Sequence, residues 1–331
     1  GDCLCKEERS RLSMALICGD EEGLVLAVLR HAKFDAKTAK RSLQACVRWR
    51  GEFGTDDIFR RRMDQSKVAK HRACWPTGFH GADRQGRPVF YDRVGQADIS
   101  SLRNSPDPFS MEDMILVYCQ NMEARRRYVL TKLSREAGRP VDQFCTVLDL
   151  QGLSHRHLSK HCFNYLRAIS AIFQDNYAGM TASLCVVNAP WLFSKAWGAI
   201  EGLLHEDTKN KIKVLGKGED GLKQLGKLIP PGDIPDFLGG PSATALGAAD
   251  PMWGEIDKAA DAWQQGGDPF LDDQRELARI MKALEAEYRA GCLPGAPEEE
   301  EEGTTTATGI GKRRRTRRNR RHVAEPGEEA G

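Results

Sequence analysis

Residues 144–154 read FCTVLDLQGLS, a nearly continuous apolar run that ends in a glycine and a serine. Such a run, at 144–150, is typical of a strand buried on both faces, as in a parallel sheet. Similar short runs follow at 184–187 (LCVV) and 211–215 (KIKVL), and another precedes them at 88–94 (PVFYDRV). Because helical patterns separate these runs, the sequence predicts an α/β fold with a mostly parallel sheet.

The helices between the strands begin at recognisable caps. The sequence SMED at 110–113 has the form of a capping box and predicts a long helix that ends near residue 137. Ser154 is expected to cap the next helix. Two further helices are predicted at 190–204 and 221–228.

The segment before the first strand has a helical pattern, and we expect a helical N-terminal lobe over residues 7–72. Leu24, Val25, Val28 and Leu29 form one apolar stripe. Asp35 is placed to cap a following helix that ends near residue 54. The strands and helices after this lobe predict a second region over residues 73–240.

The chain beyond residue 240 is divided by composition. Residues 241–296 form an extension with one predicted amphipathic helix, which begins at a capping box (DQRE, 273–276). Residues 297–331 contain five consecutive glutamates at 298–302 and the basic block KRRRTRRNRR at 312–321. With so few large apolar residues, this tail is expected to be disordered.

The basic block at 312–321 has two readings. It predicts contact with an anionic membrane or with the nuclear import machinery. The alternative is a solvated tail whose own glutamates neutralise it.

Composition excludes several classes of protein. Lys and Arg number 49 and Asp and Glu 47, so the net charge of +2 argues against a broadly basic nucleic-acid binder. No apolar run is long enough to span a bilayer, and residues 1–10 do not have the pattern of a secretory signal. Ten scattered cysteines without a CxxC pair indicate a reducing, cytoplasmic location. The start GDCLC matches a myristoylation motif only in part, since Cys5 stands where Ser or Thr is required.

Catalytic and cofactor motifs are matched weakly. GKGEDG at 216–221 fits GxGxxG, but Glu219 and Asp220 would put negative charge beside a pyrophosphate, so we reject a dinucleotide site. His157 and His161 have metal-ligand spacing but no further ligand nearby. Ser154 lies outside a GxSxG elbow, and no paired carboxylates stand at strand ends. We therefore expect no enzyme, no metal and no cofactor.

The predicted helix at 190–204 is apolar around most of its circumference. Lys195 and Glu201 are its only charged residues, and it carries Trp191 and Trp197. A helix of this kind is either fully buried or faces lipid, and tryptophan suits a membrane interface. Plain packing in a core is the alternative reading.

Six collinear segments resemble the CRAL-TRIO lipid-binding family, and in particular its phosphatidylinositol/phosphatidylcholine transfer branch. The resemblance extends over about residues 19–240. The segments are VLRHAKFDAKTAKRSLQACVRWR (28–50), DRQGRPVFYDRVG (83–95), TVLDLQGLS (146–154), VVNAPWLFSKAW (186–197), NKIKVLG (210–216) and IPDFLGG (234–240).

The resemblance implies an α/β lobe that encloses one apolar lipid pocket. The helix at 190–204 would be its gate, with gate residues Trp191, Phe193, Trp197, Ile200 and Leu204. The residues implied in headgroup binding are Lys33, Ser154, Thr208 and Lys211.

Some family positions differ in this chain. Ala32 replaces a basic residue, Phe173 a serine, and Gly179 and Met180 replace a glutamate and an arginine. Losing the glutamate removes an acceptor for inositol hydroxyls. The ligand is therefore left open between phosphatidylinositol, another phospholipid and a neutral isoprenoid lipid.

The leading hypothesis is a monomeric, cytoplasmic protein that binds a lipid and exchanges it between membranes on which it docks peripherally. A lipid sensor that presents its ligand or itself to a partner, without transfer, is the first alternative. A nucleotide-dependent enzyme is a weaker one. The basic tail adds a nuclear location as a further alternative, and no nucleic acid is required.

Overall fold

The computed structural model describes residues 31–61, 63–177 and 179–266, together with residues 25, 28, 29, 279 and 282. All of these belong to one compact unit, residues 1–286, and residues 287–331 form a second unit. The charged tail lies outside the described residues. So does most of the helix predicted from residue 273, of which only Arg279 and Lys282 are described, both as helical.

A five-stranded sheet lies at the centre of the first unit, in the order β1-β2-β3-β4-β5. The strands are β1 (Thr77–Ala82), β2 (Pro88–Asp92), β3 (Phe144–Asp149), β4 (Thr181–Val187) and β5 (Ile212–Val214). β1 is antiparallel to β2, and the other neighbours are parallel. The predicted α/β class with a mostly parallel sheet is confirmed, and β1 is an addition to the predicted strands.

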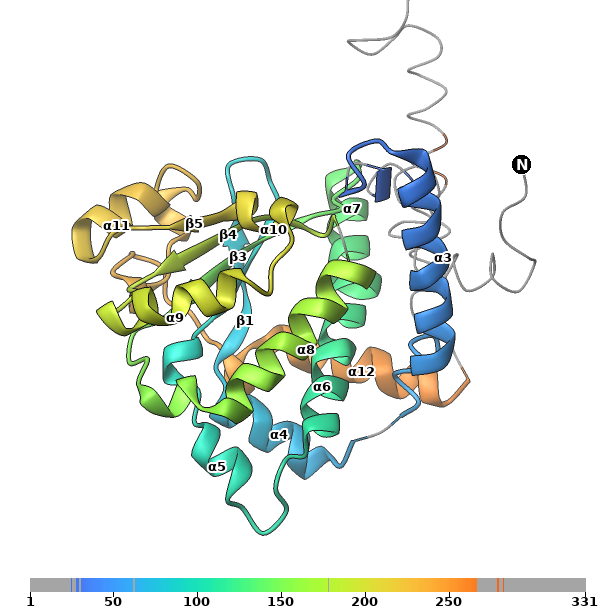
Figure 1. Ribbon diagram of the computed structural model, residues 1–331, viewed down its shortest axis with the longest axis horizontal. Coiled ribbons are helices and arrows are strands. Elements are labelled where there is room, and N and C mark those ends of the chain that lie inside the picture. The colour runs from blue at the N-terminus through green and yellow to red at the C-terminus, as the bar shows by residue number, and fades with distance from the viewer. Residues whose placement is uncertain are drawn as a thin grey trace, which may run out of the picture. The chain divides into compact units, whose positions relative to one another are not determined.

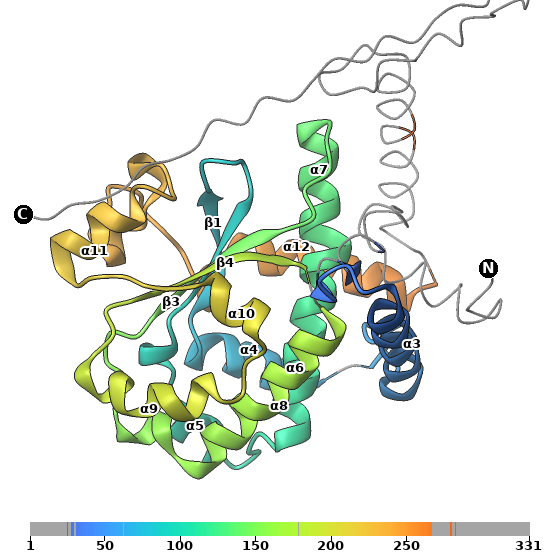
Figure 2. The ribbon, with the colours of Figure 1, turned by 45° about the horizontal axis from the view of Figure 1, so that its top comes forward.

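Helices surround this sheet. They are α3 (Ala36–Phe53), α4 (Gln65–Cys74), α5 (Ile99–Arg103), α6 (Met111–Ala124), α7 (Thr131–Ala137), α8 (Lys160–Asn176), α9 (Trp191–Glu201), α10 (Glu206–Lys211), α11 (Gly218–Leu225) and α12 (Pro251–Gln264). A π-helical turn, η2 (Arg125–Leu130), joins α6 to α7. Figures 1 and 2 show α8 and α9 on one side of the sheet and α11 on the other. Within the described residues, no helix has the length and apolar character needed to cross a membrane.

The predicted caps at Asp35 and Ser110 are present. The Asp35 carboxylate accepts a hydrogen bond from the Thr38 backbone N–H at 2.7 Å, and Gly54 ends α3 with a φ of 75°. Ser110 and Asp113 form the reciprocal bonds of a capping box at 3.0 and 2.9 Å. Local sequence therefore sets the ends of α3 and the start of α6.

The predicted cap at Ser154 is wrong as the start of α8. Ser154 precedes a short 3₁₀ turn, His155–Leu158, and its hydroxyl lies 3.1 Å from Nδ1 of His157. The N-cap of α8 is Ser159, whose hydroxyl accepts the backbone N–H of Cys162. Because the Ser154 hydroxyl already contacts His157 within the turn, Ser159 is the residue that caps α8.

Side chains of the sheet divide by the alternation of a strand. One face is a packed core with α11 and the segment that follows it. Its buried residues are Val89, Tyr91, Cys145, Val147, Cys185, Val187, Leu225, Ile229 and Ile234. The opposite face, which begins with Phe90 and Thr146, meets α8 and α9 across a cavity.

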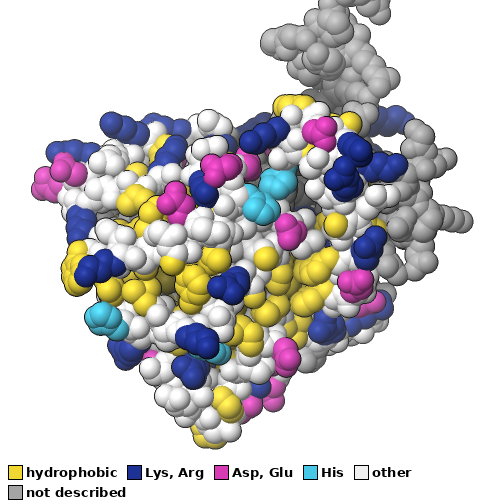
Figure 3. Space-filling view, viewed as in Figure 1, with side chains coloured by type: hydrophobic (Ala, Val, Ile, Leu, Met, Phe, Trp, Pro, Cys, Tyr) yellow, Lys and Arg dark blue, Asp and Glu magenta, His cyan; other side chains and the backbone are white. Residues whose placement is uncertain are grey.

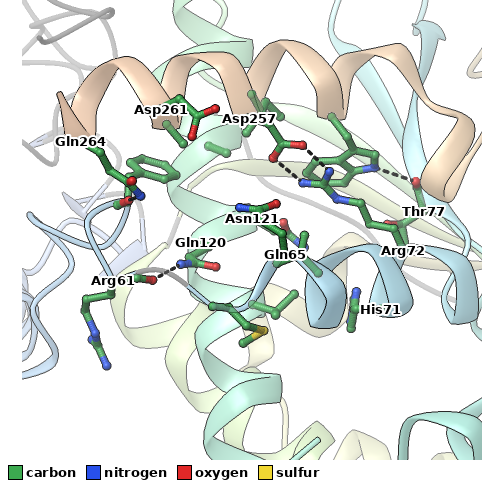
Figure 4. Close-up of a pocket in the computed structure, with 18 residues that line it drawn as sticks. Arg61, Gln65, His71, Arg72, Thr77, Gln120, Asn121, Asp257, Asp261 and Gln264 are labelled. Atoms are coloured by element: carbon green, nitrogen blue, oxygen red, sulfur yellow. Dashed lines mark hydrogen bonds and ion pairs between the residues drawn. The ribbon is translucent and has the colours of Figure 1, made fainter. Parts of the chain in front are cut away.

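Helix α12 was not predicted from the sequence, and it packs against α4 and α6. Trp253 and Ile256 are buried in the core there. Asp257 pairs with both terminal nitrogens of Arg72 at 2.6 and 2.8 Å, and Trp253 donates to the Thr77 carbonyl at 3.3 Å. Figure 4 shows these contacts around a cavity of about 80 Å³, whose polar side chains mostly bond one another or the backbone. We therefore assign this small cavity to the packing of α12 and not to a ligand site.

Candidate functional site

A cavity of about 370 Å³ lies between the sheet and helices α6, α8 and α9. This volume is within the range of about 300–1,000 Å³ that is usual for small-molecule sites. Most of its lining is apolar. The sheet contributes alternate residues, which form rows in register across the strands: Phe90, Thr146, Leu184 and Ile212 in one row, and Asp92, Leu148 and Val186 in the next.

The helices on this side keep their apolar stripes only half buried. In α8, the described apolar residues that line the cavity include Leu166, Ile169 and Phe173, and none of them is fully buried. Helix α9 has no buried residue at all. Figure 3 shows hydrophobic side chains gathered over α8 and α9, with basic side chains among them. Apolar stripes that line a cavity instead of a packed core indicate a site for an apolar ligand.

Four of the predicted gate residues line the cavity: Phe193, Trp197, Ile200 and Leu204. The first two rings pack against each other, with centroids 5.4 Å apart. Trp191 is not part of the lining, and its side chain is 64% exposed at the start of α9. The structure thus places one tryptophan of this helix inward and the other in solvent.

The predicted headgroup residues divide into two groups. Thr208 and Lys211, both on α10, line the cavity. Lys211 pairs with Asp207 at 2.7 Å, and His31 lies 3.7 Å from the same carboxylate. These residues gather at one end of the cavity.

Lys33 and Ser154 do not line this cavity. Lys33 is exposed on the turn before α3, with a φ of 52°. Ser154 is occupied by His157, whose other ring nitrogen lies 3.0 Å from the Ala97 carbonyl. Lys33 nevertheless lies near the start of α10, since its charge is among those that lower the pKa of Glu206.

Sequence reasoning missed a polar group inside the cavity. Asp92 of β2 and Arg125 of η2 are part of the lining, together with Trp75, Tyr118 and Tyr165. The indole N–H of Trp75 donates to the Asp92 carboxylate at 2.8 Å. A run of three arginines after an apolar helix, and an aspartate at the end of a buried strand, were the signals that could have found it.

The interior of the cavity shifts the ionisation of these groups. Burial raises the pKa of Asp92 to about 6, although the Trp75 hydrogen bond and the charge of Arg125 favour the carboxylate. Burial also lowers the pKa of Arg125 to about 10, with the neighbouring Tyr118 hydroxyl and Asp92 acting in the opposite direction. Arg125 remains charged at neutral pH.

The glycine loop at 216–221 is explained by packing. A Cβ on Gly221 would lie 2.2 Å from the Gly216 carbonyl oxygen, so the start of α11 requires glycine there. The Gly216 N–H donates to the Gln224 side chain at 3.3 Å, so this amide is already used. The part of the chain that the structure describes contains no group of three metal-ligating side chains.

Comparisons with known proteins agree with this geometry. Residues 72–240 match the CRAL/TRIO domain family. The Sec14 cytosolic factor of Schizosaccharomyces pombe is 33% identical over 220 residues, which cover 66% of this chain and 74% of that protein. The phosphatidylinositol/phosphatidylcholine transfer protein SFH12 of Arabidopsis thaliana is 28% identical over 221 residues, covering 67% of this chain and 40% of that protein.

A structural comparison finds a crystal structure of Sfh5 with a TM-score of 0.49 and 16% sequence identity, covering 77% of this chain and 82% of the other. The family match covers about half of the chain and includes every strand of the sheet. This chain therefore belongs to the CRAL/TRIO domain family.

Proposed function

We propose that this protein binds a lipid in the cavity between the sheet and α8 and α9, and exchanges it between membranes. The carrying observation is the cavity itself, whose apolar lining leaves the inner stripes of both helices half buried. The names of the relatives support lipid carriage, since one of them is a phosphatidylinositol/phosphatidylcholine transfer protein.

Energetics explains why a closed site is needed. A phospholipid with two chains buries about thirty methylene groups, at about 0.8 kcal/mol each, or roughly 25 kcal/mol in all. Exposure of those chains to water would make unaided exchange very slow. A pocket lined by Leu, Ile, Phe and Trp replaces the bilayer interior during transfer.

Helix α9 is the proposed gate. Its inner face, including Trp197 and Ile200, lines the cavity, while Trp191 is exposed on its first turn. Tryptophan is favoured at the membrane–water interface. Insertion of Trp191 would bring α9 to the bilayer, and movement of α9 there would open the cavity only where lipid can be exchanged.

The polar end of the cavity at α10 is a proposed headgroup contact. Thr208 and Lys211 line it, and a hydroxyl with a cation can hold a phosphate. Lys33, whose charge acts on Glu206 at the start of α10, is a further candidate for this contact. The protein would act in the cytoplasm and dock peripherally, with no catalytic step and no cofactor.

Vesicle-to-vesicle transfer of labelled phospholipid by the full chain tests this proposal. The wild type should transfer lipid, and Ile200→Arg, which places a charge in the cavity lining, should abolish transfer. Trp191→Ala should slow transfer several-fold while changing stability by only about 0.5 kcal/mol, because the side chain is mostly exposed. Tight lipid binding without any transfer would instead favour the sensor.

A further inference from the structure

Arg125 is an unusual residue in the lining of this cavity. Its side chain lies at the start of the π-helical turn η2, and the residue is only 9% exposed. Its Nε is buried without a hydrogen-bond partner, and one terminal nitrogen contacts only the sulfur of Met122, at 3.6 Å. Among the described residues, no carboxylate forms an ion pair with it.

Aromatic rings surround the Arg125 guanidinium, and the charges of Tyr118 and Asp92 also favour its charged form. The guanidinium carbon lies 3.5 Å from the centre of the Phe90 ring and 5.6 Å from that of Phe144. Cation–π contacts of this kind offset part of the cost of removing a cation from water. They leave the N–H groups of the guanidinium unused, because ring faces accept no strong hydrogen bond. A π-helical turn is also rare, and such turns occur frequently at functional sites.

We propose that Arg125 is the binding site for an anionic oxygen group of the bound lipid, a carboxylate or a phosphate, held inside the cavity. This rests on the proposed function. An anionic oxygen pairs with a guanidinium through short, charge-assisted hydrogen bonds, often two in parallel. In a cavity without bulk water such a pair is worth more than in solvent.

The same cation sets the specificity of the cavity. The guanidinium offers N–H donors that a carboxylate or a phosphate can accept and a trimethylammonium group cannot, although the Asp92 carboxylate in the same lining offsets part of the positive charge. The cavity therefore favours an acidic lipid over one with a choline headgroup. Lys211 at the α10 end adds a second cation, but Asp207 already neutralises it.

Lipid uptake by the full chain tests this specificity. The protein is incubated with vesicles of phosphatidylcholine and phosphatidic acid in equal parts, and separately with phosphatidylcholine and oleic acid, and the bound lipid is extracted and identified. We expect the acidic lipid to be enriched about tenfold or more over phosphatidylcholine in at least one arm. The two arms distinguish a phosphate from a carboxylate. Uptake of phosphatidylcholine in proportion to its share of both vesicles would overturn the proposal.

Variants separate the role of Arg125 from general charge effects. Arg125→Gln should lose the enrichment, Arg125→Lys should retain part of it, and Arg156→Gln, which removes an exposed arginine outside the lining, should keep it. Squalene, which has no polar group, should bind the wild type and Arg125→Gln equally. Squalene binding without enrichment would contradict only the role of Arg125, and failure to bind any lipid would contradict the proposed function as well.

Discussion

Arg125, Arg126 and Arg127 are consecutive, and yet they lie in two different environments. Arg126 and Arg127 both pair with the buried carboxylate of Glu123, Arg127 through its Nε at 2.9 Å. Arg125 points to the other side, where it lines the cavity beside Phe90. Arg126 and Arg127 thus share a carboxylate at ion-pair distance, although Nε of Arg126 has no partner, whereas Arg125 has no carboxylate at that distance among the described residues.

The cluster around Glu123 joins helix α3 to the part of the chain that contains the sheet. Glu123 also accepts hydrogen bonds from Arg50 of α3 at 3.0 Å and from the Tyr177 hydroxyl at 2.9 Å. Arg127 reaches the Thr55 carbonyl at 3.0 Å. Burial alone would raise the pKa of Glu123, but the charges of Arg126, Arg50 and Arg127 hold it well below its usual range. The comparison teaches that the arginines between elements share a carboxylate at ion-pair distance, whereas Arg125 in the cavity lining interacts with Asp92 only at longer range.

The largest effect on stability is expected from Glu123→Gln. Removal of this charge leaves three arginines without their shared carboxylate, which should cost about 3–5 kcal/mol of the free energy of unfolding. Urea denaturation of the full chain measures it. The matched control is Glu112→Gln, on the exposed side of the same helix, where the loss should stay within about 0.5 kcal/mol.

The pH dependence of this effect follows from its sign. Because the folded-state pKa of Glu123 is lowered, its contribution is fully present above the pKa of the unfolded chain and is lost as the pH falls through the folded-state value. The difference between wild type and Glu123→Gln should therefore be complete at neutral pH and shrink in acid. Equal stability of the two proteins at pH 7 would contradict the account of this region.

The variants Arg126→Gln and Arg125→Gln compare the Glu123 cluster with the cavity lining at neighbouring positions. Arg126→Gln breaks a buried charged hydrogen bond and should cost about 2–3 kcal/mol. Arg125→Gln breaks no ion pair and removes a desolvated charge, so the free energy of unfolding should change by about 1 kcal/mol or less. Denaturation curves recorded side by side check this. A larger loss of stability from Arg125→Gln than from Arg126→Gln would contradict the conclusion that Arg126, and not Arg125, forms a stabilising buried ion pair.

A smaller effect, of opposite sign, is expected at Asp92. Since burial raises its pKa to about 6, ionisation of Asp92 opposes folding, and stability is lost as the pH rises from the unfolded-state pKa through about 6. The stability of Asp92→Asn relative to that of the wild type should therefore be higher at pH 7 than at pH 4. Thermal unfolding of both proteins at the two pH values measures this difference.

Asp98→Asn is the control for this pH test. Asp98 is the N-cap of α5, and its hydrogen bonds from the Ser101 side chain and backbone lower its pKa. The stability of Asp98→Asn relative to that of the wild type should therefore be lower at pH 7 than at pH 4, which is the opposite of the trend expected for Asp92→Asn. Identical trends for the two variants would argue against a dry environment at Asp92.

Sequence patterns predicted the parallel part of the sheet because β3 and β4 are short, uninterrupted apolar runs. β1 (TGFHGA) escaped because two glycines and a histidine weaken its strand pattern, and its stability comes from pairing with β2. The start signal of α12 was overlooked: Asp250 accepts the Met252 N–H at 2.9 Å, and Pro251 follows it at the first helical position. The packing of Trp253 and Ile256, which stabilises the helix, could not be read from the sequence.

The site was predictable only in part. The apolar character of 190–204 left a buried helix and a lipid-facing helix open, and in the structure α9 has no buried residue. The position of Arg125 depends on the π-helical turn and on the two aromatic rings beneath it, which no local pattern specifies. Thr208 and Lys211 came from the family resemblance, and their place in the lining depends on how α10 meets β4 and β5.

Native mass spectrometry of the purified full chain tests the central claim most directly, because it reports what occupies the cavity. The account predicts one lipid molecule per chain, which is lost from Ile200→Arg while the protein remains folded. A chain that carries no ligand after exposure to membranes, or that carries a nucleotide instead, would contradict it.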